Sequence, residues 1–374
     1  MSELYRSFEK YVMGAGDRLL LKKLKFSEWN AIFKKKKLYS DVVWTNEQQK
    51  AFDDFYMSTY GKRFSNRWHR LYQSMNGHFD IKYFPEILFS TKLEKKLNPR
   101  NYAEVLCDKN LIRYVYGGVD GVRAVREYAS CKNGVYCDRD GRPAAKETIL
   151  GMLKNVGSCV IKPTTDTGSG KGVVFFDIQN GKDTGSGKTI EEIINGYGEN
   201  FAVQERLAEH ESFAALHPGS INTIRLITYI CDGELYHVPL AMRIGSGNSE
   251  LDNIHAGGMC VGVGDDGTLR SKAFRLGYGD NNEYFTEHPD THIVFDGYKL
   301  SCIPKMIRSA YALHMHTPQL GLISWDFIID PDEKVVLIEA NLYNQSIWFP
   351  QIVNEAPAFG ENTGKMLEMI RDYK

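Results

Sequence analysis

The sequence predicts an α+β fold, in which a helical N-terminal region precedes sheets made of antiparallel hairpins. Helical periodicity is clearest at residues 47–60 and 67–76, within a basic, aromatic-rich first hundred residues. From about residue 101, short β-branched segments bounded by Gly, Asp and Pro replace that pattern. These segments lack the regular strand–helix spacing of a doubly wound parallel sheet, which favours α+β over α/β.

The predicted elements follow one another in a hairpin-rich order. The strands that we expect are 158–162, 172–178, 201–206, 223–231, 234–244, 322–329 and 334–341. The helices that we expect, beyond those named above, are 189–195 and 303–315.

Composition excludes several classes of protein. The chain has 374 residues, 43 % hydrophobic and 25 % charged, which is typical of a globular protein. No run of about 18 apolar residues exists, so membrane-spanning helices are not expected, and the first residues do not resemble a secretion signal. The seven scattered cysteines are expected to be reduced thiols, and we therefore expect a cytoplasmic protein.

Charge divides the chain unevenly. Residues 1–100 hold 20 Lys and Arg against 11 Asp and Glu, whereas the remainder is acidic. The lysine run 34–37 is either a solvated helix face or a surface attracted to anionic lipid or a phosphorylated substrate. No arginine-rich or aromatic-interleaved pattern predicts nucleic-acid binding.

A glycine-rich segment follows the strand 158–162. The sequence Asp-Thr-Gly-Ser-Gly-Lys occurs at 166–171 and again at 183–188, but neither copy has the spacing of a P-loop or of a dinucleotide fingerprint. A glycine-rich turn between two strands can still close over phosphates with its backbone N–H groups. Lys162 is expected near the core, either with a phosphate as partner or as a snorkelling side chain beside a mobile hairpin.

The segment 324–341 predicts a hairpin with a metal site. A turn centred between residues 332 and 333 places Asp326 opposite Glu339 in a bulge-free pair, with Asn341 on the same face and Val336, Ile338 and Ala340 on the buried one. Like charges about 5 Å apart across a strand pair repel. Two carboxylates and an amide oxygen favour Mg²⁺ or Mn²⁺, and an exposed acidic hairpin is the alternative.

Strand parity also places two arginines. In 234–244 the even positions are apolar, so Arg243 and His237 are expected on the other face. A two-residue turn at Asp232-Gly233 would put Arg225 on the apolar face, whereas a three-residue loop would put it beside Arg243. We expect the longer loop.

Together these motifs resemble the ATP-grasp superfamily. The resemblance rests on Lys162 before the glycine-rich loop, on the segment Val203–Leu207, and on Asp326, Glu339 and Asn341 in that order. The segments 222–225, 241–243 and 252–258 are more similar to ribosomal-protein glutamate ligases and, more closely, to sugar-transfer-associated ATP-grasp proteins. The resemblance covers about 101–360, and Tyr83-Phe84-Pro85-Glu86 is also similar to the sugar-associated group.

The resemblance implies an ATP-grasp fold and a set of site residues. Three units are expected: a helical region at 1–100, a small subdomain with the phosphate loop at 101–200, and a large subdomain with the metal site at 201–374. ATP and two Mg²⁺ ions, or Mn²⁺, are the implied cofactors, with Asp326, Glu339 and Asn341 as metal ligands. The implied ATP-binding residues are Lys109, Lys162, Thr164, Gly168, Ser169, Gly170, Lys171, Gln204, Glu205, Arg206 and Leu207. Asn253 would join the metal or phosphate shell, and Arg225 and Arg243 would hold the acyl phosphate and oxyanion.

The implied reaction joins a carboxylate to an amine through an acyl phosphate, with a uronic-acid sugar of a capsule or O-antigen precursor as the expected carboxylate. An amino-acid or peptide ligase, a kinase and an ATP-sensing module without chemistry are the alternatives. Partners are therefore a small or sugar-linked carboxylate and an amine, with membrane or lipid-linked contact through the basic N-terminal region at the inner face of the membrane. The aromatic residues that could stack on sugars are Trp68, Tyr72, Tyr83, Phe84, Trp348 and Phe349. His314-x-His316 and Cys131…Cys137 are expected to be structural, not metal-binding.

Overall fold

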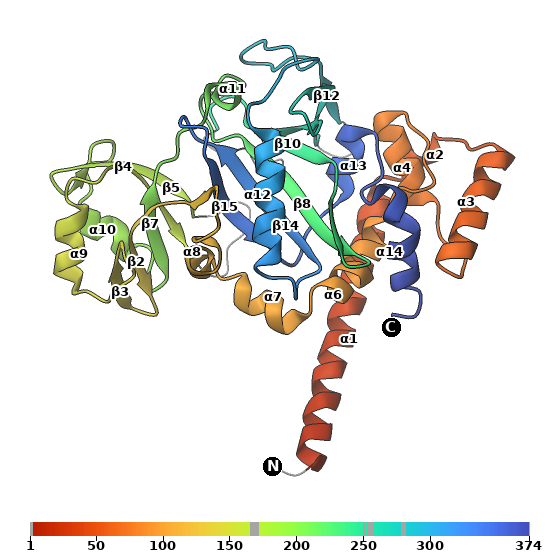
Figure 1. Cartoon of the computed structure of the whole chain (residues 1–374), viewed down its shortest axis with the longest axis horizontal. Coiled ribbons are helices and arrows are strands. Elements are labelled where there is room, and N and C mark those ends of the chain that lie inside the picture. Colours follow the sequence, from red (N-terminus) through yellow and green to blue (C-terminus); the bar gives the residue numbers. More distant parts are fainter. Residues whose placement is uncertain (1–2, 165–171, 250–251, 253–256, 278–281, 374) are drawn as a thin grey trace.

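The computed structural model has two sheets, with α-helices beside each (Figure 1). It describes residues 3–164, 172–249, 252, 257–277 and 282–373, and the side chains of all of these except 3–15, 17 and 110. The α+β architecture expected from the sequence is confirmed. No helix among these residues is long and apolar enough to cross a membrane.

The helices and strands have the following bounds. The helices are α1 Glu3–Lys34, α2 Lys36–Ser40, α3 Asn46–Thr59, α4 Arg67–Asn76, α5 Glu86–Leu88, α6 Glu94–Leu97, α7 Arg100–Leu106, α8 Ile112–Tyr116, α9 Lys146–Leu153, α10 Ile190–Asn195, α11 Glu211–Ala214, α12 Ile303–Met315, α13 Trp348–Asn354 and α14 Thr363–Met369, with a π-helical turn at Phe89–Leu93 and 3₁₀ turns at Lys109–Leu111 and Gly360–Asn362. The strands are β1 Val122–Ala124, β2 Glu127–Lys132, β3 Val135–Asp138, β4 Gly157–Pro163, β5 Val174–Gln179, β6 Lys182–Asp183, β7 Phe201–Glu205, β8 Thr223–Cys231, β9 Glu234–His237, β10 Leu240–Ile244, β11 Met259–Val263, β12 Leu269–Arg275, β13 Glu283–Phe285, β14 Leu322–Ile329 and β15 Val335–Asn341.

The smaller sheet has six antiparallel strands in the order β3-β2-β7-β4-β5-β6. Ile149 and Leu153 of α9 and Ile193 and Ile194 of α10 pack into its core. Since β7 is a central strand of this sheet, the boundary expected at residue 200 is wrong, and the sheet ends only after Glu205. A capping box at Thr189 starts α10 one residue later than expected, because an N-cap residue keeps extended backbone angles.

The larger sheet has nine strands, with β1-β15-β14-β8-β10-β11-β12-β13 in order and β9 beside β8. One face packs on α12, where Met306 and Leu313 meet Leu226 and Trp325 in one apolar core (Figure 1). We call this the α12 face. The opposite face packs on α13, α14 and the N-terminal helices at one end, and carries the candidate site at the other; we call it the site face.

The predicted strand 234–244 is interrupted at Val238-Pro239. Thr228 pairs with His237 in β9, but Arg225 pairs with Ala241 in β10, so one residue is gained between the two strands. Proline lacks the N–H that a continuous ladder requires, which explains the interruption. The predicted shared face of His237 and Arg243 is therefore wrong: His237 points to the α12 face, where its ring lies 6.1 Å from that of Tyr311.

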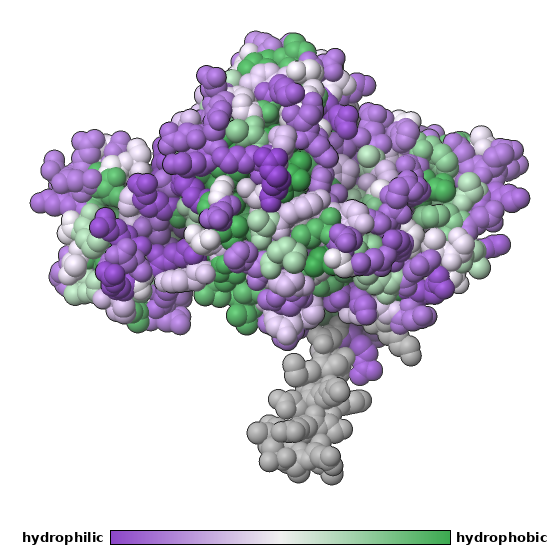
Figure 2. All heavy atoms as spheres, viewed as in Figure 1, coloured by the Kyte–Doolittle hydropathy of each residue, from purple (hydrophilic) through white to green (hydrophobic). Residues whose placement is uncertain are grey.

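The N-terminal helices form an aromatic core with the C-terminal helices. Five of the six aromatic residues considered for sugar stacking are buried there, which contradicts that role for them; they are Trp68, Tyr72, Tyr83, Phe84 and Phe349. Gln351 of α13 makes two hydrogen bonds with the backbone of Phe84. Phe84 N donates to Gln351 Oε1, and Gln351 Nε2 donates to Phe84 O. Figure 2 shows hydrophilic residues over much of the surface that carries α12.

Asn98 links the N-terminal region to the strands of the candidate site. Its buried Nδ2 donates to Leu322 O at 2.6 Å and Leu342 O at 2.7 Å, and its Oδ1 accepts from Leu322 N at 3.0 Å. These three groups lie at the ends of β14 and β15.

We predict that Asn98→Ala lowers the free energy of unfolding by about 3 kcal/mol, because it leaves buried backbone groups without partners. Urea unfolding followed by circular dichroism measures this change. Asn101→Ala is the control, since Asn101 is exposed on α7 and should change stability by less than about 0.5 kcal/mol. Equal unfolding midpoints for the two variants would contradict the structural role of Asn98.

Candidate active site

The hairpin of β14 and β15 places Asp326 directly opposite Glu339, as predicted. The predicted reason is wrong, because the hairpin is centred on residue 332 and contains a bulge. Phe327 pairs with Leu337, so Ile338 is the extra residue that restores the Asp326–Glu339 pairing. The bulge also leaves Ile338 half-buried, whereas Val335, Val336 and Leu337 are buried in succession; the expected single buried face is therefore incorrect.

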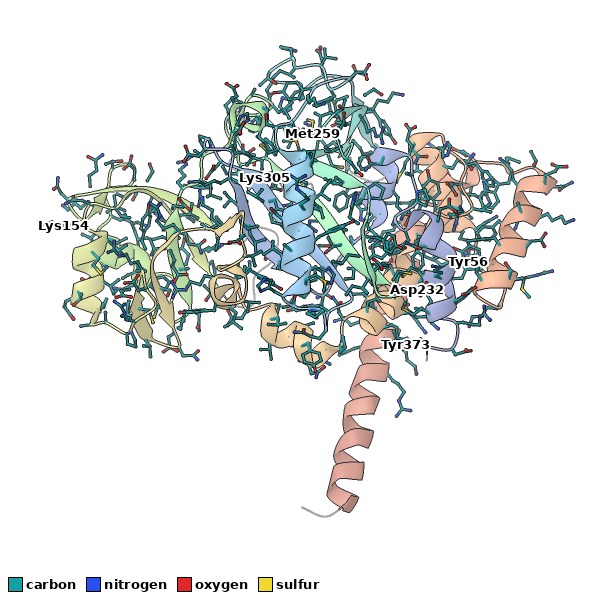
Figure 3. The ribbon with its side chains drawn as sticks, viewed as in Figure 1. Tyr56, Lys154, Asp232, Met259, Lys305 and Tyr373 are labelled. Carbon is teal, nitrogen blue, oxygen red and sulfur yellow. The ribbon has the colours of Figure 1, made fainter. Side chains whose placement is uncertain are left out.

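Arg225 of β8 pairs directly with Asp326 and binds its carboxylate with two hydrogen bonds. The donors are Nε at 2.6 Å and Nη2 at 3.1 Å. The loop after β8 is the two-residue turn Asp232-Gly233, with φ of 52° and 82°, so the expected three-residue loop is wrong (Figure 3). The residue gained at Val238-Pro239 has the same effect on register, and Arg225 lies on the face of Arg243 as expected.

Arg243 of β10 completes a buried charge cluster. Its Nη2 lies 3.2 Å from Asp326 Oδ2, and its Nε lies 3.4 Å from Asp252 Oδ2. Thr223 accepts from both Nε and Nη2 of Arg243, and its own hydroxyl donates to Asp252. Burial alone would raise the pKa of Asp326, but the two guanidinium groups lower it below the usual value.

Glu339 and Asn341 extend this cluster along β15. Glu339 Oε1 lies 3.2 Å from Lys109 Nζ, and Asn341 Nδ2 lies 3.4 Å from Asp326 Oδ2. All three predicted metal ligands therefore share the site face with both arginines. Among the described residues no group of three His, Cys, Asp or Glu side chains gathers as a metal site, so a cation here would need ligands in addition to two carboxylates.

Lys162 of β4 reaches the same region from the smaller sheet. A cavity of about 20 Å³ between the sheets is lined by Lys109, Lys162, Gln204 and Ile338, together with Arg113 and Glu127. Burial and the positive charge of Lys109 lower the pKa of Lys162 to about 8, although Glu339 and Glu127 oppose this shift. Two lysines, one arginine and one carboxylate thus line this cavity, and Glu339 lies beside it in contact with Lys109.

The predicted phosphate loop can be followed only in part. Gly168, Ser169, Gly170 and Lys171 lie outside the described residues, as does Asn253. Thr164 is buried, and its Oγ1 has no hydrogen-bond partner among the described residues. The second copy of the repeat is a tight turn after β6, in which Asp183 accepts from Ser186 N at 2.7 Å.

The segment 204–207 differs from the strand that we expected, because β7 ends at Glu205. Gln204 lines the cavity. The Glu205 carboxylate forms an ion pair with Arg123, and the Glu205 backbone N–H donates to Arg126 O at 3.0 Å. Arg206 lies over the ring of Phe175 at 4.8 Å, and Leu207 lies beyond the strand.

Several charged partners of the site were not predicted. Arg113 Nη1 lies 3.3 Å from Glu127 at the cavity, and Arg123 joins Glu205 of one sheet to Asp330 of the other. Such pairs come from residues far apart in the chain, and no local pattern indicates them. Asp252 is different, because it lies in the segment 252–258, which is one basis of the family resemblance. An acidic residue in that segment could have been recognised as part of the site.

His314 and the cysteine pair lie inside the fold. His314 uses both ring nitrogens inside the fold, with Thr228 Oγ1 at 2.6 Å and Leu320 O at 2.7 Å. Cys131 and Cys137 are buried, and both are free thiols.

The loop after Asn341 is held by two buried glutamates of the N-terminal region. Glu94 accepts from Gln345 N at 2.7 Å, and Glu86 accepts from Ile347 N at 3.2 Å. Burial raises the pKa of Glu86 to about 8 and that of Glu94 to about 7. The N-terminal region therefore positions the segment that directly follows the candidate metal ligands.

A family model described as sugar-transfer associated ATP-grasp matches residues 88–365, well over half of the chain. This range includes both sheets and every residue of the charge cluster. No curated protein matches the chain.

Solved structures that match this chain include several ligases. The D-Ala:D-Ser ligase VanG from Enterococcus faecalis is 12 % identical, with a TM-score of 0.41 over 72 % of this chain and 62 % of that one. The D-alanyl-alanine synthetase A from Vibrio cholerae is 12 % identical, with a TM-score of 0.40 over 71 % and 65 %. The chain thus spans just under two thirds of the length of these two ligases.

We predict that the affinity for a non-hydrolysable ATP analogue falls as pH rises from 7 to 9. The Lys162 ammonium is charged below its pKa of about 8 and neutral above it, so attraction to a triphosphate is lost with rising pH. Calorimetric titration with AMPPNP measures the affinity. Lys162→Arg should flatten the profile and Lys188→Arg, at an exposed position, should not. The same pH dependence in wild type and Lys162→Arg would contradict this role.

Proposed function

The chain belongs to the sugar-transfer associated ATP-grasp family, and on this basis we propose that it is an ATP-dependent ligase that joins a carboxylate to an amine. The observation that supports this most directly is the pairing of Asp326 with Arg225 and Arg243 beside Glu339 and Lys109. The cluster combines anions that can hold a cation with fixed cations that can hold phosphates and an oxyanion.

ATP would bind between the two sheets. Lys109 and Lys162 would neutralise its phosphates, and the free hydroxyl of Thr164 would donate to one of them. Gln204 and Ile338 line the cavity where the adenine would lie. A cavity of about 20 Å³ holds about one water molecule, so a nucleotide would need more room between the sheets than this cavity gives.

The residues present fit Mg²⁺, which proteins commonly bind through one or two carboxylates plus substrate phosphates. Asp326, Glu339 and Asn341 would hold it, with Mn²⁺ as an alternative and a second ion shared with the phosphates. A carboxylate has about four lone-pair positions, so Asp326 can accept from the arginines and still bind a cation. The ion would supply charge neutralisation at the β- and γ-phosphates.

The chemistry would proceed in two displacements. An oxygen of the substrate carboxylate attacks the γ-phosphorus, forming an acyl phosphate and releasing ADP. The amine nitrogen then attacks the acyl carbon, and phosphate leaves as the amide forms. Arg225 and Arg243 would hold the acyl phosphate and stabilise the oxyanion of the second step, because fixed positive charge in a buried site costs no reorganisation.

The carboxylate that we propose belongs to a uronic-acid sugar of a capsule or O-antigen precursor, and the amine is small or an amino acid. The association of this family with sugar transfer supports this choice. Both arginines lie on the site face, and the N–H groups that they do not use for Asp326, Asp252 and Thr223 would donate to the substrate carboxylate.

The test is amide formation from uronic acids and a panel of amines with Mg-ATP, followed by mass spectrometry and phosphate release. We expect condensation with loss of water in wild type. Glu339→Gln should lower the rate about a hundredfold while preserving the fold, because it removes one negative ligand. Asp332→Asn, exposed in the turn of the same hairpin, is the matched control and should retain the activity.

The products distinguish the alternatives. Turnover restricted to amino-acid or peptide carboxylates indicates a peptide ligase, and a stable phosphoester with ADP indicates a kinase. Binding of ATP without turnover under all conditions indicates a sensing module. Full activity of Glu339→Gln would contradict the assigned metal site.

We also propose that the protein acts in the cytoplasm at an anionic membrane surface. Figure 1 shows α1 projecting from the rest of the molecule, and its Leu19 and Phe26 are 70 % and 74 % exposed. Lys22 and Lys23 are exposed on the same helix. Exposed apolar residues beside lysines favour a helix that lies on lipid headgroups.

Lys22→Glu/Lys23→Glu should weaken binding to phosphatidylserine vesicles about tenfold or more at low salt, because each lysine contributes about 1 kcal/mol near such a surface. Vesicle co-sedimentation measures binding, and high salt should reduce wild-type binding as well. The control is Lys154→Glu/Lys188→Glu, which makes the same charge change near the smaller sheet. Wild-type binding that is absent at low salt, or unchanged at high salt, would contradict an electrostatic origin.

A further inference from the structure

A second, much larger cavity lies away from the candidate active site. It has a volume of about 950 Å³ and lies between β12 and β13 at the sheet edge, the end of α4, and the end of α13. Figure 1 shows α4 and α13 beside the β12 edge of the sheet. We call this cavity the edge groove, and its volume is within the range of ligand pockets.

The floor of the edge groove is basic. Arg270, Lys272 and Phe274 alternate along β12, so they share one face, while Leu269 and Ala273 pack into the α12 core. Arg270 and Lys272 are both exposed and line the groove. Neither has an ion pair with any residue in the described part of the chain, so both can pair with an anionic ligand. The carboxylates of Asp296 and Glu355 also line the groove, on segments outside β12.

One end of the groove is aromatic. Tyr284 of β13 pairs with Phe274, with ring centroids 5.6 Å apart, and Tyr284 is 46 % exposed. An exposed aromatic ring with a hydroxyl offers an apolar face and a hydrogen bond, which suits the C–H face and hydroxyl groups of a sugar. This aromatic surface was not among those predicted from the sequence.

The wall supplies a buried acceptor without a donor. Asn354 is 7 % exposed, and its Nδ2 donates to Leu240 O at 2.8 Å and to Pro350 O at 3.0 Å. Its Oδ1 has no hydrogen-bond partner among the described residues. Gly262 allows this arrangement, because a Cβ there would lie 2.6 Å from both Asn354 Oδ1 and Arg270 Cγ. These contacts with β10 and β11 fix the α13 wall of the groove.

The edge groove lies on the same sheet face as the candidate active site. Arg243 pairs with Cys260, and Cys260 pairs with Phe274, so Phe274 is two strands, or about 10 Å, from Arg243. Trp348 is half-buried against Phe274, with ring centroids 6.0 Å apart. The groove and the arginines therefore lie on one sheet face, with the buried side chains of Cys260 and Phe274 between them.

From these observations we infer that the edge groove binds the glycan chain of the acceptor substrate, an acidic oligosaccharide whose charged groups pair with Arg270 and Lys272. This inference rests on the proposed ligase function for its biological meaning. The binding itself needs no ATP, so it can be tested separately.

The test is calorimetric titration of the full chain, without ATP, using tetragalacturonate as the acidic probe and maltotetraose as the neutral one. We expect wild type to prefer tetragalacturonate about tenfold or more, and Arg270→Glu/Lys272→Glu to lose about that factor. Arg270→Lys/Lys272→Arg should retain binding, and Tyr284→Ala should weaken binding of both probes. Lys154→Glu/Lys188→Glu controls for net charge, and unchanged AMPPNP binding in each variant shows that the fold is intact.

Two results would overturn the inference: no tetragalacturonate binding by wild type, or equal binding by wild type and Arg270→Glu/Lys272→Glu. Failure of the inference about the edge groove can be distinguished from failure of the ligase proposal. Amide formation with the same KM for an acidic oligosaccharide in wild type and Arg270→Glu/Lys272→Glu would overturn the groove and leave the ligase in place. Charge-dependent binding without ligation of any amine would support the groove and remove the ligase.

Discussion

The site face of the larger sheet depends on one buried carboxylate shared by two arginines. Asp326 accepts from Arg225 on the adjacent strand and from Arg243 one strand further, so three neighbouring strands are joined by one charge cluster. A buried charge without a partner is strongly unfavourable, and removing Asp326 would leave two guanidinium groups facing each other. The order of β14, β8 and β10 and the location of the site are therefore parts of one arrangement.

Charge is also balanced between the two sheets. Glu339 pairs with Lys109, and Lys162 faces both from the smaller sheet. The depressed pKa of Lys162 indicates that the present carboxylates do not fully compensate for burial and for the second lysine. An additional anion between the sheets would relieve this imbalance, and a bound phosphate would supply it.

The sequence could predict local elements because their signals are local. β8, β14, α4 and α12 have the predicted bounds, since strand and helix periodicity, turn residues and caps lie within each segment. Strand register was harder to predict, because it depends on two extra residues, at Ile338 and at Val238-Pro239, that were not predicted. The extra residue at Ile338 restores the Asp326–Glu339 pairing, although the turn is centred on residue 332 and not between residues 332 and 333. The extra residue at Val238-Pro239 has the effect on register that was expected of a longer loop after β8. The parallel pairing of β1 with β15, and the ion pairs of Arg123, join distant segments and leave no pattern in one sequence.

The N-terminal region is the part whose role changes most once the structure is known. Its composition indicates a basic surface, and exposed lysines on α1 agree with that. Yet its aromatic residues form a core with the C-terminal helices, and Glu86, Glu94 and Asn98 bind the ends of the strands and the loop beside the candidate metal ligands. Helices that hold these segments in place cannot also offer their aromatic rings to a sugar. Stacking on a substrate must then use rings outside this core, and Tyr284 is an exposed aromatic residue that lines a ligand-sized groove on the site face.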